Sequence, residues 1–287
     1  MKLANEWKDY QILDMAEGQK LEKWGDVILS RPDPQIIWKD KSFPKKWKDI
    51  NATYHRSKTG GGSWEFTKKM PKQWQVKYKN LIFNIKPMGF KHTGLFPEQA
   101  VNWDWMIQKI KNEKRQIKVL NLFAYTGGAT VACLSAGASV CHVDSSKGMT
   151  TWAKENVTSS GLQDRPVRFI IDDVVKFVNR EIRRGNFYDA IIMDPPSYGR
   201  GAKGEVWQFE ENIYDLVELC SKVLSDKPLF FLINSYTTGI SSKVLENILR
   251  LTVAKNNKGK IEAGEIGLPM QNSELVLPCG IYGRWEK

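Results

Sequence analysis

The sequence contains little cysteine and little histidine. The cysteines lie far apart and form no Cys-x-x-Cys pair, which argues against a zinc site and against a disulfide framework. The histidines have no spacing typical of metal ligands. These residues are Cys133, Cys141, Cys220, Cys279, His55, His92 and His142. We therefore predict a protein without a metal ion.

Long apolar runs are also missing. No run approaches the roughly 18 residues that a membrane-spanning helix needs, and the first residues, Met-Lys-Leu-Ala-Asn-Glu-Trp-Lys, contain no apolar signal core. A hydrophobic content of 41% in 287 residues is enough for a globular protein with its own core. We therefore expect a cytoplasmic protein with no membrane partner, built as one large domain or as a typical domain with a smaller one.

Acidic residues are too few to balance the basic ones, and the first third of the chain carries most of the difference. The net charge is +11, and residues 1–100 hold 19 Lys and Arg against 11 Asp and Glu, with six of the eleven tryptophans. Basic side chains interleaved with aromatic rings suit a polyanion with stackable bases, such as RNA. The alternative is a basic, solvated surface around a small core.

One segment concentrates this basic and aromatic pattern. Residues 38–48 carry five lysines around Phe43 and Trp47, which makes this segment the best candidate for a loop that contacts phosphates. A solvated basic loop explains the same residues almost as well.

The pattern of hydrophobic residues divides the chain into two main regions joined by a linker. Residues 1–88 predict a small, basic, β-rich domain with short strands at 10–13, 27–31, 52–55, 64–67, 75–78 and 81–86. The last two strands are separated by Lys-Asn and predict a hairpin. Residues 89–116 predict a linker and a helix, and residues 117–287 predict the main domain.

The main domain alternates predicted strands with predicted helices. Strands at 117–123, 139–143, 167–171, 188–193 and 228–233 are followed by helices at 128–136, 147–160, 174–184, 208–224 and 241–255. This alternation indicates an α/β fold with a mostly parallel sheet covered on both faces. A terminal hairpin at 260–266 and 274–285 completes seven strands, of which the last is antiparallel.

Ligands of open α/β sheets bind at the carboxyl ends of the strands, so the residues at these ends are candidates for a site. The first strand is followed by Gly127 and Gly128, which allow a tight turn and a close approach to the backbone. The surrounding residues match neither Gly-x-Gly-x-x-Gly nor a nucleotide-triphosphate loop.

Acids follow the next three strands. Asp144 is placed to accept hydrogen bonds from a ribose diol, while Ser145 or Ser146 caps the next helix. Of Asp172 and Asp173, one is placed to accept from an exocyclic amine and the other to cap a helix, and we favour Asp173 for the ligand.

The fourth strand is followed by Asp194-Pro-Pro-Ser-Tyr. The prolines remove two N–H donors and fix the turn. Asp194 and the carbonyl of Pro195 then suit a target amine, and Tyr198 suits stacking on a target base.

Together these motifs resemble a class I, Rossmann-like, S-adenosylmethionine-dependent methyltransferase. The run at 121–128 and the segment at 89–99, Gly-Phe-Lys-His-Thr-Gly-Leu-Phe-Pro-Glu-Gln, are most similar to the bacterial large-subunit (23S) ribosomal RNA methyltransferases. The chain departs from that family at residues 96–99, where Leu-Asp-x-Arg is usual.

The resemblance implies a binding pocket for S-adenosylmethionine. It assigns the methionine part to the loop after the first strand, the ribose to Asp144 with the adjacent Ser145, and the adenine amine to Asp172 or Asp173. The resemblance also implies that Asp194 lies beside the transferred methyl group and that three residues before the domain close the pocket. The loop residues are Phe123, Ala124, Tyr125, Thr126 and Gly127, and the closing residues are Thr93, Phe96 and Gln99.

The chain lacks a cysteine after the fifth predicted strand, and this absence bears on which atom is methylated. Family members that methylate carbon 5 of a pyrimidine place a nucleophilic cysteine at the end of the fifth strand, where this chain has Tyr236. Without a thiolate the usual carbon-5 route is absent, which leaves atoms that have a lone pair, namely a ring or exocyclic nitrogen or an oxygen. We favour a nitrogen of a base in ribosomal RNA. Asp194, Tyr198 and Asn234 are then the candidates that position the acceptor.

Other functions remain open to the sequence alone. They are an atypical carbon-5 route on cytosine, a small-molecule or protein acceptor, and a non-catalytic RNA-binding module with a relic pocket. The sequence is compatible with a monomer and with a homodimer.

Overall fold

The computed structural model describes all residues except 58–60 and 201–205. The chain forms two compact units. The large unit comprises Met1, Asn102–Ile266 and Gly280–Lys287, and the small unit comprises Lys2–Val101 and Gly267–Cys279. The C-terminal hairpin therefore contributes residues to both units.

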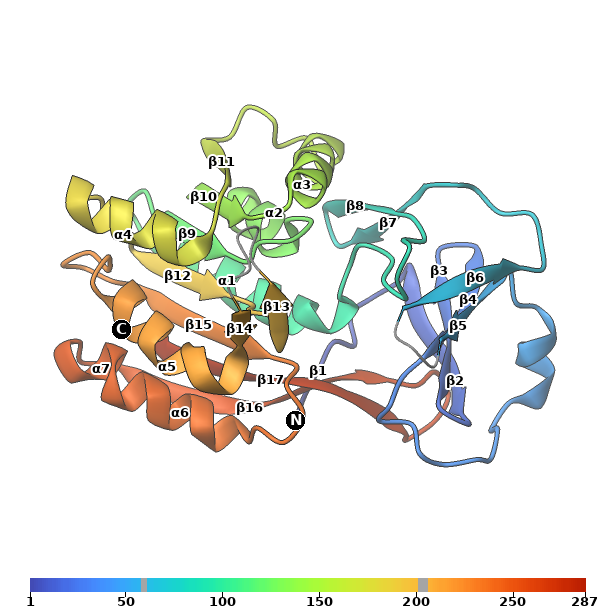
Figure 1. The fold of residues 1–287 in the computed structure, drawn as a ribbon. Helices are drawn as coiled ribbons and strands as arrows, with labels where there is room; N and C mark the ends of the chain where they lie inside the picture. The colour runs from blue at the N-terminus through green and yellow to red at the C-terminus, as the bar shows by residue number, and fades with distance from the viewer. Residues whose placement is uncertain (58–60, 201–205) are drawn as a thin grey trace. The chain divides into compact units, whose positions relative to one another are not determined.

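The large unit contains the predicted strand–helix alternation (Figure 1). Five strands are mutually parallel in the order β15-β12-β9-β10-β11, and β17 pairs with β15 in the antiparallel direction. Together with β16 they are the seven predicted strands, and the two-residue β1, whose residues belong to the small unit, is the neighbour of β16 in the sheet. Their bounds are β1 (Lys2–Leu3), β9 (Lys118–Leu122), β10 (Ser139–Asp144), β11 (Val167–Ile171), β12 (Ala190–Met193), β15 (Phe230–Ser235), β16 (Lys260–Pro269) and β17 (Val276–Glu286).

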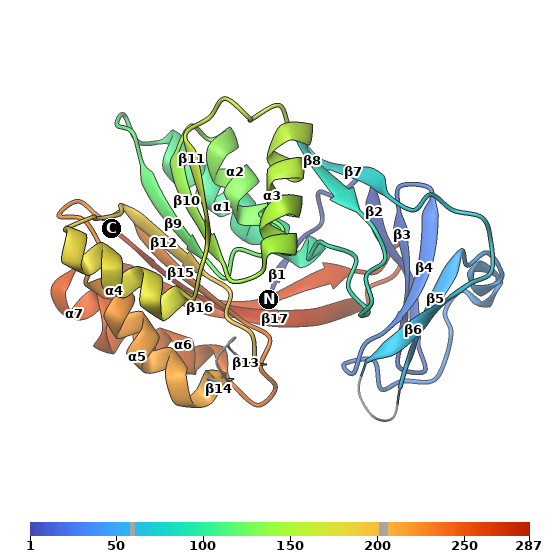
Figure 2. The same cartoon turned by 45° about the horizontal axis from the view of Figure 1, so that its top comes forward.

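Helices cover both faces of this sheet (Figures 1 and 2). Helices α4, α5 and α6 pack on one face, and α1, α2 and α3 lie on the other. Their bounds are α1 (Ala100–Lys111), α2 (Gly128–Ser135), α3 (Lys147–Ser159), α4 (Val174–Arg184), α5 (Phe209–Ser221), α6 (Ser242–Leu251) and the short α7 (Val253–Asn256). The α/β class predicted from the sequence is confirmed.

Alternation along the strands decides which side chains enter which layer. Leu120 and Leu122 of β9 join a buried apolar cluster with α4, α5 and α6. Asn121 lies between them and points to the other face, where its amide donates to Thr130 of α2. Polar side chains on that second face are therefore buried among helices and need partners there.

The strand order places the switch point of the sheet at β9. This strand pairs with β10 on one side and with β12 on the other, although β10 is next in the chain and β12 is not. The loops that leave neighbouring strands at such a point diverge and open a crevice for a ligand.

The small unit is built from β-strands. Its five-stranded sheet has the order β2-β3-β4-β5-β6, and β7 pairs with β8 as the predicted hairpin. The sequence did not reveal β3, because its Glu22 is buried beside Leu21 and breaks the alternation. The bounds are β2 (Tyr10–Ala16), β3 (Gln19–Trp24), β4 (Val27–Pro32), β5 (Ala52–Arg56), β6 (Gly62–Phe66), β7 (Trp74–Tyr78) and β8 (Leu81–Ile85).

A buried ion pair lies inside the small unit. Arg31 donates to both carboxylate oxygens of Glu22, at 2.6 and 2.8 Å, and the hydroxyl of Tyr10 donates at 2.7 Å. Burial opposes the ionisation of Glu22, but Arg31 and Lys20 outweigh it and lower its pKa to about 2. The pair is thus ionised and fully hydrogen-bonded, as a buried charge must be.

The basic segment at residues 38–48 is tied to the small unit by one acid. Asp14 is fully buried and accepts from the backbone N–H of Phe43 at 2.8 Å and from the indole of Trp47 at 2.9 Å. Lys41 lies over the Trp47 ring and pairs with Glu17. The Trp47 ring is therefore engaged within the protein, and the contact of this segment with phosphates stays a prediction.

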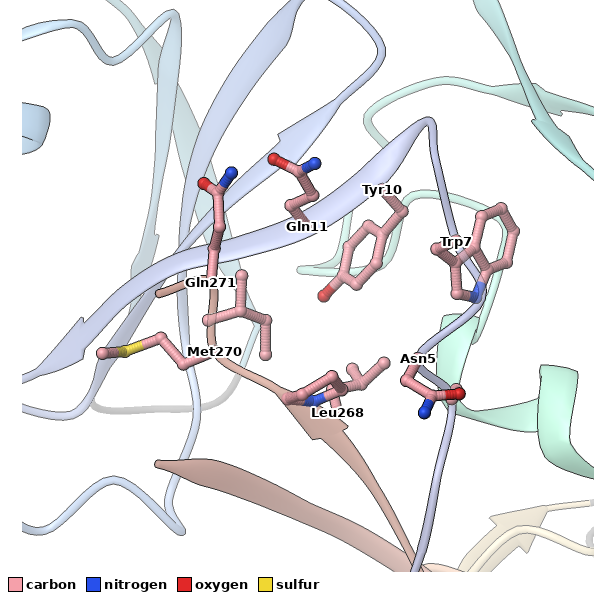
Figure 3. Close-up of a pocket in the computed structure, with 10 residues that line it drawn as sticks. Asn5, Trp7, Tyr10, Gln11, Leu268, Met270 and Gln271 are labelled. Atoms are coloured by element: carbon pink, nitrogen blue, oxygen red, sulfur yellow. The ribbon is translucent and has the colours of Figure 1, made fainter. Parts of the chain in front are cut away.

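A small cavity lies where the C-terminal hairpin meets the first residues of the small unit. Figure 3 shows Trp7 and Tyr10 on one side and Leu268 and Met270 on another. Its volume is about 120 Å³, which is room for a few water molecules and not for a nucleotide.

Candidate active site at the carboxyl ends of the strands

The loop after β9 has an unusual backbone. Phe123 and Tyr125 have φ angles of 52° and 51°, a region that costs a residue with a side chain roughly 1–3 kcal/mol. Hydrogen bonds hold this shape, because Ala124 N–H donates to the Val143 carbonyl at 3.1 Å and Tyr125 N–H donates to Asp144 at 2.8 Å. Strain of this kind gathers at ligand sites.

The two glycines after this loop are required by packing. A Cβ atom on Gly127 would lie 2.9 Å from the Cβ of Ala153, and one on Gly128 would lie 2.8 Å from the ring of Trp103. Gly127 also has a φ of 82°. The turn therefore needs glycine so that α2 can pack closely against α3 and α1, a reason that the sequence motif alone did not give.

Asp144 joins the loops that follow three strands. Its carboxylate accepts from Tyr125 N–H and Ser146 N–H, each at 2.8 Å and each on a different oxygen. Its backbone carbonyl accepts from Asp172 N–H at 3.1 Å. Burial raises the pKa of this half-buried carboxyl, and the two backbone N–H groups oppose that shift. Each oxygen retains acceptor capacity, so the carboxylate fits a vicinal diol.

Ser146 is the cap of α3. Its hydroxyl accepts from Met149 N–H, whereas Ser145 is exposed. Of the two serines considered as the cap, Ser146 therefore has that role.

The two acids after β11 have separate structural tasks. Asp173 is the N-cap of α4 and accepts from Lys176 N–H at 2.9 Å. Asp172 forms an ion pair with Arg180. Asp173, which we favoured for the contact with an exocyclic amine of the ligand, is therefore the helix cap. Asp172 is then the candidate for that contact.

The loop after β12 meets the loops after β9 and β15. The indole of Trp207 donates to the Pro196 carbonyl at 2.6 Å, and its ring centroid lies 5.6 Å from that of Phe123. Thr237, which follows β15, donates to the hydroxyl of Ser197 at 2.9 Å. These contacts hold the two residues Pro196 and Ser197, which follow Asp194 closely in the chain.

Two of the predicted residues near Asp194 differ in exposure. Pro195 is buried, whereas Tyr198 is 53% exposed and lies in β13 (Tyr198–Arg200), which pairs with β14 (Val206–Gln208). Trp207 of β14 was missed by sequence reasoning, because a single tryptophan outside the motifs carries no local signal.

Asn234 is buried and held by a chain of polar side chains. Asn102 of α1 donates from its amide nitrogen to the Asn234 oxygen at 2.9 Å, and Arg284 of β17 donates twice to the Asn102 oxygen, at 3.1 and 2.5 Å. Because Met193 pairs with Ile233 in register, the next residues, Asp194 and Asn234, follow on adjacent strands. The sequence indicated neither Asn102 nor Arg284.

His142 belongs to the core of the large unit. Its Nδ1 lies 2.9 Å from the Thr130 hydroxyl, and burial lowers its pKa to about 3. The imidazole is neutral at physiological pH, which agrees with a structural role and not with acid–base catalysis.

The cysteines of the large unit are not placed for nucleophilic attack. Cys133, Cys141 and Cys220 are buried, and burial raises the pKa of each thiol, for Cys141 to about 11. The position after β15 holds Tyr236, whose ring would be 3.0 Å from a Cβ atom on Gly280. A thiolate is therefore not available from these residues.

Thr93, Phe96 and Gln99 belong to the small unit. Thr93 and Gln99 are buried and Phe96 is partly exposed. Their role in closing a cofactor pocket stays a prediction.

Outside residues 58–60 and 201–205, no group of three or more His, Cys, Asp or Glu side chains is placed to hold a metal ion. Within that part of the chain, no helix is both long and apolar enough to cross a membrane.

The parallel sheet, its antiparallel last strand and the acids at the strand ends define a class I methyltransferase. The family of S-adenosylmethionine-dependent methyltransferases matches residues 52–250. The chain belongs to this family, and its cofactor is S-adenosylmethionine.

Known proteins agree with this assignment. A crystal structure of an S-adenosylmethionine-dependent methyltransferase from Agrobacterium tumefaciens is 34% identical, with a TM-score of 0.93 over 99% of this chain and 92% of that one. A putative methyltransferase from Streptococcus mutans shares the fold at 16% identity, with a TM-score of 0.76 over 98% of this chain and 76% of that one.

Curated relatives extend beyond the matched region. The ribosomal RNA large subunit methyltransferase K/L of Shewanella baltica is 35% identical over 210 residues, which are 70% of this chain and 28% of that protein. The chain spans about a quarter of the length of the first curated relatives it matches.

Proposed function

We propose that this protein transfers a methyl group from S-adenosylmethionine to a nitrogen of a base in ribosomal RNA. The observation that supports nitrogen over carbon is the side chain after β15. Tyr236 stands there, and the buried thiols of the large unit have raised pKa values. An amine or ring nitrogen has its own lone pair and needs no covalent activation by the protein.

The loops after β9, β10 and β11 would hold the cofactor. Residues 123–127 would take the methionine part, Asp144 with Ser145 the ribose, and Asp172 the adenine amine, since Asp173 caps α4. Bound there, S-adenosylmethionine supplies an electrophilic methyl group. Thr93, Phe96 and Gln99 are proposed to close the pocket, within a linker and helix at residues 89–116.

Asp194 and Asn234 would position the acceptor nitrogen. A carboxylate accepts hydrogen bonds from an amine, and the amide of Asn234 offers N–H groups to a neighbouring acceptor atom of the base. The carbonyl of Pro195 would add a second acceptor, and Tyr198 would stack on the base. A paired base would first be flipped out, at a cost of about a few kcal/mol.

Two observations support ribosomal RNA as the substrate. Relatives such as that of Shewanella baltica are named as ribosomal RNA methyltransferases, and the first 100 residues carry 19 basic against 11 acidic side chains. RNA contact by a domain at residues 1–88, methylation by residues 117–287 and a cytoplasmic location are parts of this proposal.

Two measurements, made one after the other, test the proposal. Calorimetry with S-adenosylmethionine should show one binding site, and labelled cofactor should then transfer label to ribosomal RNA from a strain that lacks the gene. If the label appears in protein or in small metabolites and not in RNA, the acceptor of the methyl group is not RNA. Absence of cofactor binding would refute the methyltransferase itself.

A further inference from the structure

A groove with charge of one sign lies on the small unit, along the segment that follows β6. It has a volume of about 450 Å³. Its apolar lining comes from Phe66, Met70, Pro71 and Pro87, and its charged lining comes from Lys68, Lys69 and Lys72. Among the residues that the structure describes, no acidic one lines it. We call this feature the lysine groove.

The lysines of this groove are available to a ligand. Lys68 pairs with Asp49 at 2.9 Å, but both side chains are exposed, and exposed pairs of this kind contribute little. In the described part of the chain, no carboxylate lies within ion-pair distance of Lys69 or Lys72. Three cations along one groove fit a row of phosphates.

Exposed aromatic rings accompany these cations. Phe66 is 59% exposed and Phe90 is 63% exposed. Trp64 connects their segments, because its indole donates to the carbonyls of Met88 at 2.7 Å and Phe90 at 3.3 Å. An exposed phenyl ring beside lysines provides a surface on which a base can stack.

A second cleft on the small unit is less suitable. It has a volume of about 590 Å³ and shares Lys69 with the lysine groove, but Asp9 and Asp26 also line it. These carboxylates repel phosphates, so the two clefts are not equivalent for a polyanion.

We propose that the lysine groove binds single-stranded RNA, with lysines 68, 69 and 72 on the phosphates and Phe66 stacked on a base. This proposal rests on the proposed function, because RNA is its substrate, and adds a contact surface apart from the residues that hold the cofactor. Every base has a π-face, so the groove binds without strong sequence preference.

Fluorescence anisotropy with a labelled oligouridine about 12 nucleotides long, within the usual range of single-strand sites, tests the groove. The variant K68A/K69A/K72A should bind at least about 10-fold more weakly. Its logarithmic salt slope should fall by about 2, since each phosphate contact on a single strand contributes about 0.7. Phe66→Ala should weaken binding about 10-fold without changing the slope.

The matched control is K255A/K258A/K260A, which removes three exposed lysines from the large unit at residues 255–260. Its Kd for the oligouridine should be within about twofold of that of the native protein, because scattered surface charges contribute little. If K68A/K69A/K72A binds RNA as tightly as the native protein does, phosphates bind outside the lysine groove and the proposal is wrong. If only the lysines matter and Phe66→Ala has no effect, the stacking role is wrong. Tight binding of a polyglutamate peptide with no binding of RNA would indicate an acidic protein partner instead.

Methyl transfer by the same variants separates this proposal from the proposed function. Cofactor affinity should stay unchanged, and the KM for RNA should rise with the loss of binding. Equal rates of methyl transfer by the native protein and the variants would contradict RNA binding in the lysine groove. They would not contradict the proposed methyltransferase function. No transfer to RNA by the native protein would overturn the proposed function, whatever the groove binds.

Discussion

Asn102 donates a hydrogen bond to Asn234 across the layer between α1 and β15, at 2.9 Å. Arg284 has only donors and contacts the Asn102 oxygen twice, so the Asn102 nitrogen must face Asn234. Asn234 therefore accepts with its oxygen, and its nitrogen is the group left for a ligand. Next to Asp194, this arrangement gives one donor and one acceptor on adjacent strand ends.

Asn102→Asp tests this polarity. The new carboxylate would form an ion pair with Arg284 and would turn the Asn234 amide, so that an oxygen replaces the N–H group presented to the acceptor. We expect thermal stability to be kept and methyl transfer to fall about 10- to 100-fold, the worth of one or two positioned hydrogen bonds.

Asn102→Leu is the control for that variant, since it removes the oxygen that accepts twice from the buried Arg284 and should lower both stability and activity. Stability is read from thermal unfolding and activity from kcat. Full activity in Asn102→Asp would show that the orientation of Asn234 has no role.

Asp144→Asn should weaken the binding of S-adenosylmethionine by at least about 10-fold. The variant loses the charged group that accepts hydrogen bonds from the ribose diol. Asp172→Asn should also weaken the cofactor, whereas Asp173→Asn should not, since asparagine caps helices as well as aspartate does. Calorimetry measures all three. A larger effect at Asp173 than at Asp172 would reverse our assignment of the adenine contact.

Cofactor affinity should depend on pH through Asp144. Burial raises the pKa of this carboxyl, so it becomes protonated at a higher pH than an exposed aspartate and then donates where it should accept. We expect affinity to be constant at neutral pH and to fall on acidification, earlier than ordinary aspartates titrate. Calorimetry at decreasing pH measures this, and Asp144→Asn should abolish the dependence.

The small unit should lose stability in acid through Glu22. Its pKa is lowered from 4.5 to about 2, so the folded state binds fewer protons than the unfolded state in that interval. The stabilisation is complete above pH 4.5 and is lost as the pH falls toward 2. Thermal unfolding between these values measures it, and a flat profile would mean that Glu22 and Arg31 are not paired.

Trp207→Ala should impair catalysis by freeing the turn after Asp194. It removes the bond to the Pro196 carbonyl and the contact with Phe123, and we expect a fall in kcat of about 10-fold or more from lost positioning. Trp207→Phe keeps the ring and loses only the N–H group, so its effect should be smaller. Equal kcat in both variants and the native protein would exclude this role.

The sequence predicted local features well. Strand and helix periods are repeated within each segment, and the acids at the strand ends lie next to them in the chain. The site's supporting contacts were out of its reach, because Asn102 and Arg284 are separated by 182 positions and no local pattern pairs them. Buried charge also hid β3, since Glu22 looks like a surface residue until Arg31 is opposite it.

The most direct test of the central claim is the identity of the methylated nucleoside. Ribosomal RNA from a deletion strain is treated with the protein and labelled S-adenosylmethionine, digested to nucleosides and analysed by mass spectrometry. A base methylated on nitrogen is the predicted product, and it should be absent with Asp194→Ala. A 5-methylpyrimidine would contradict the assignment, because it would require a carbon nucleophile to be formed without a thiolate after β15.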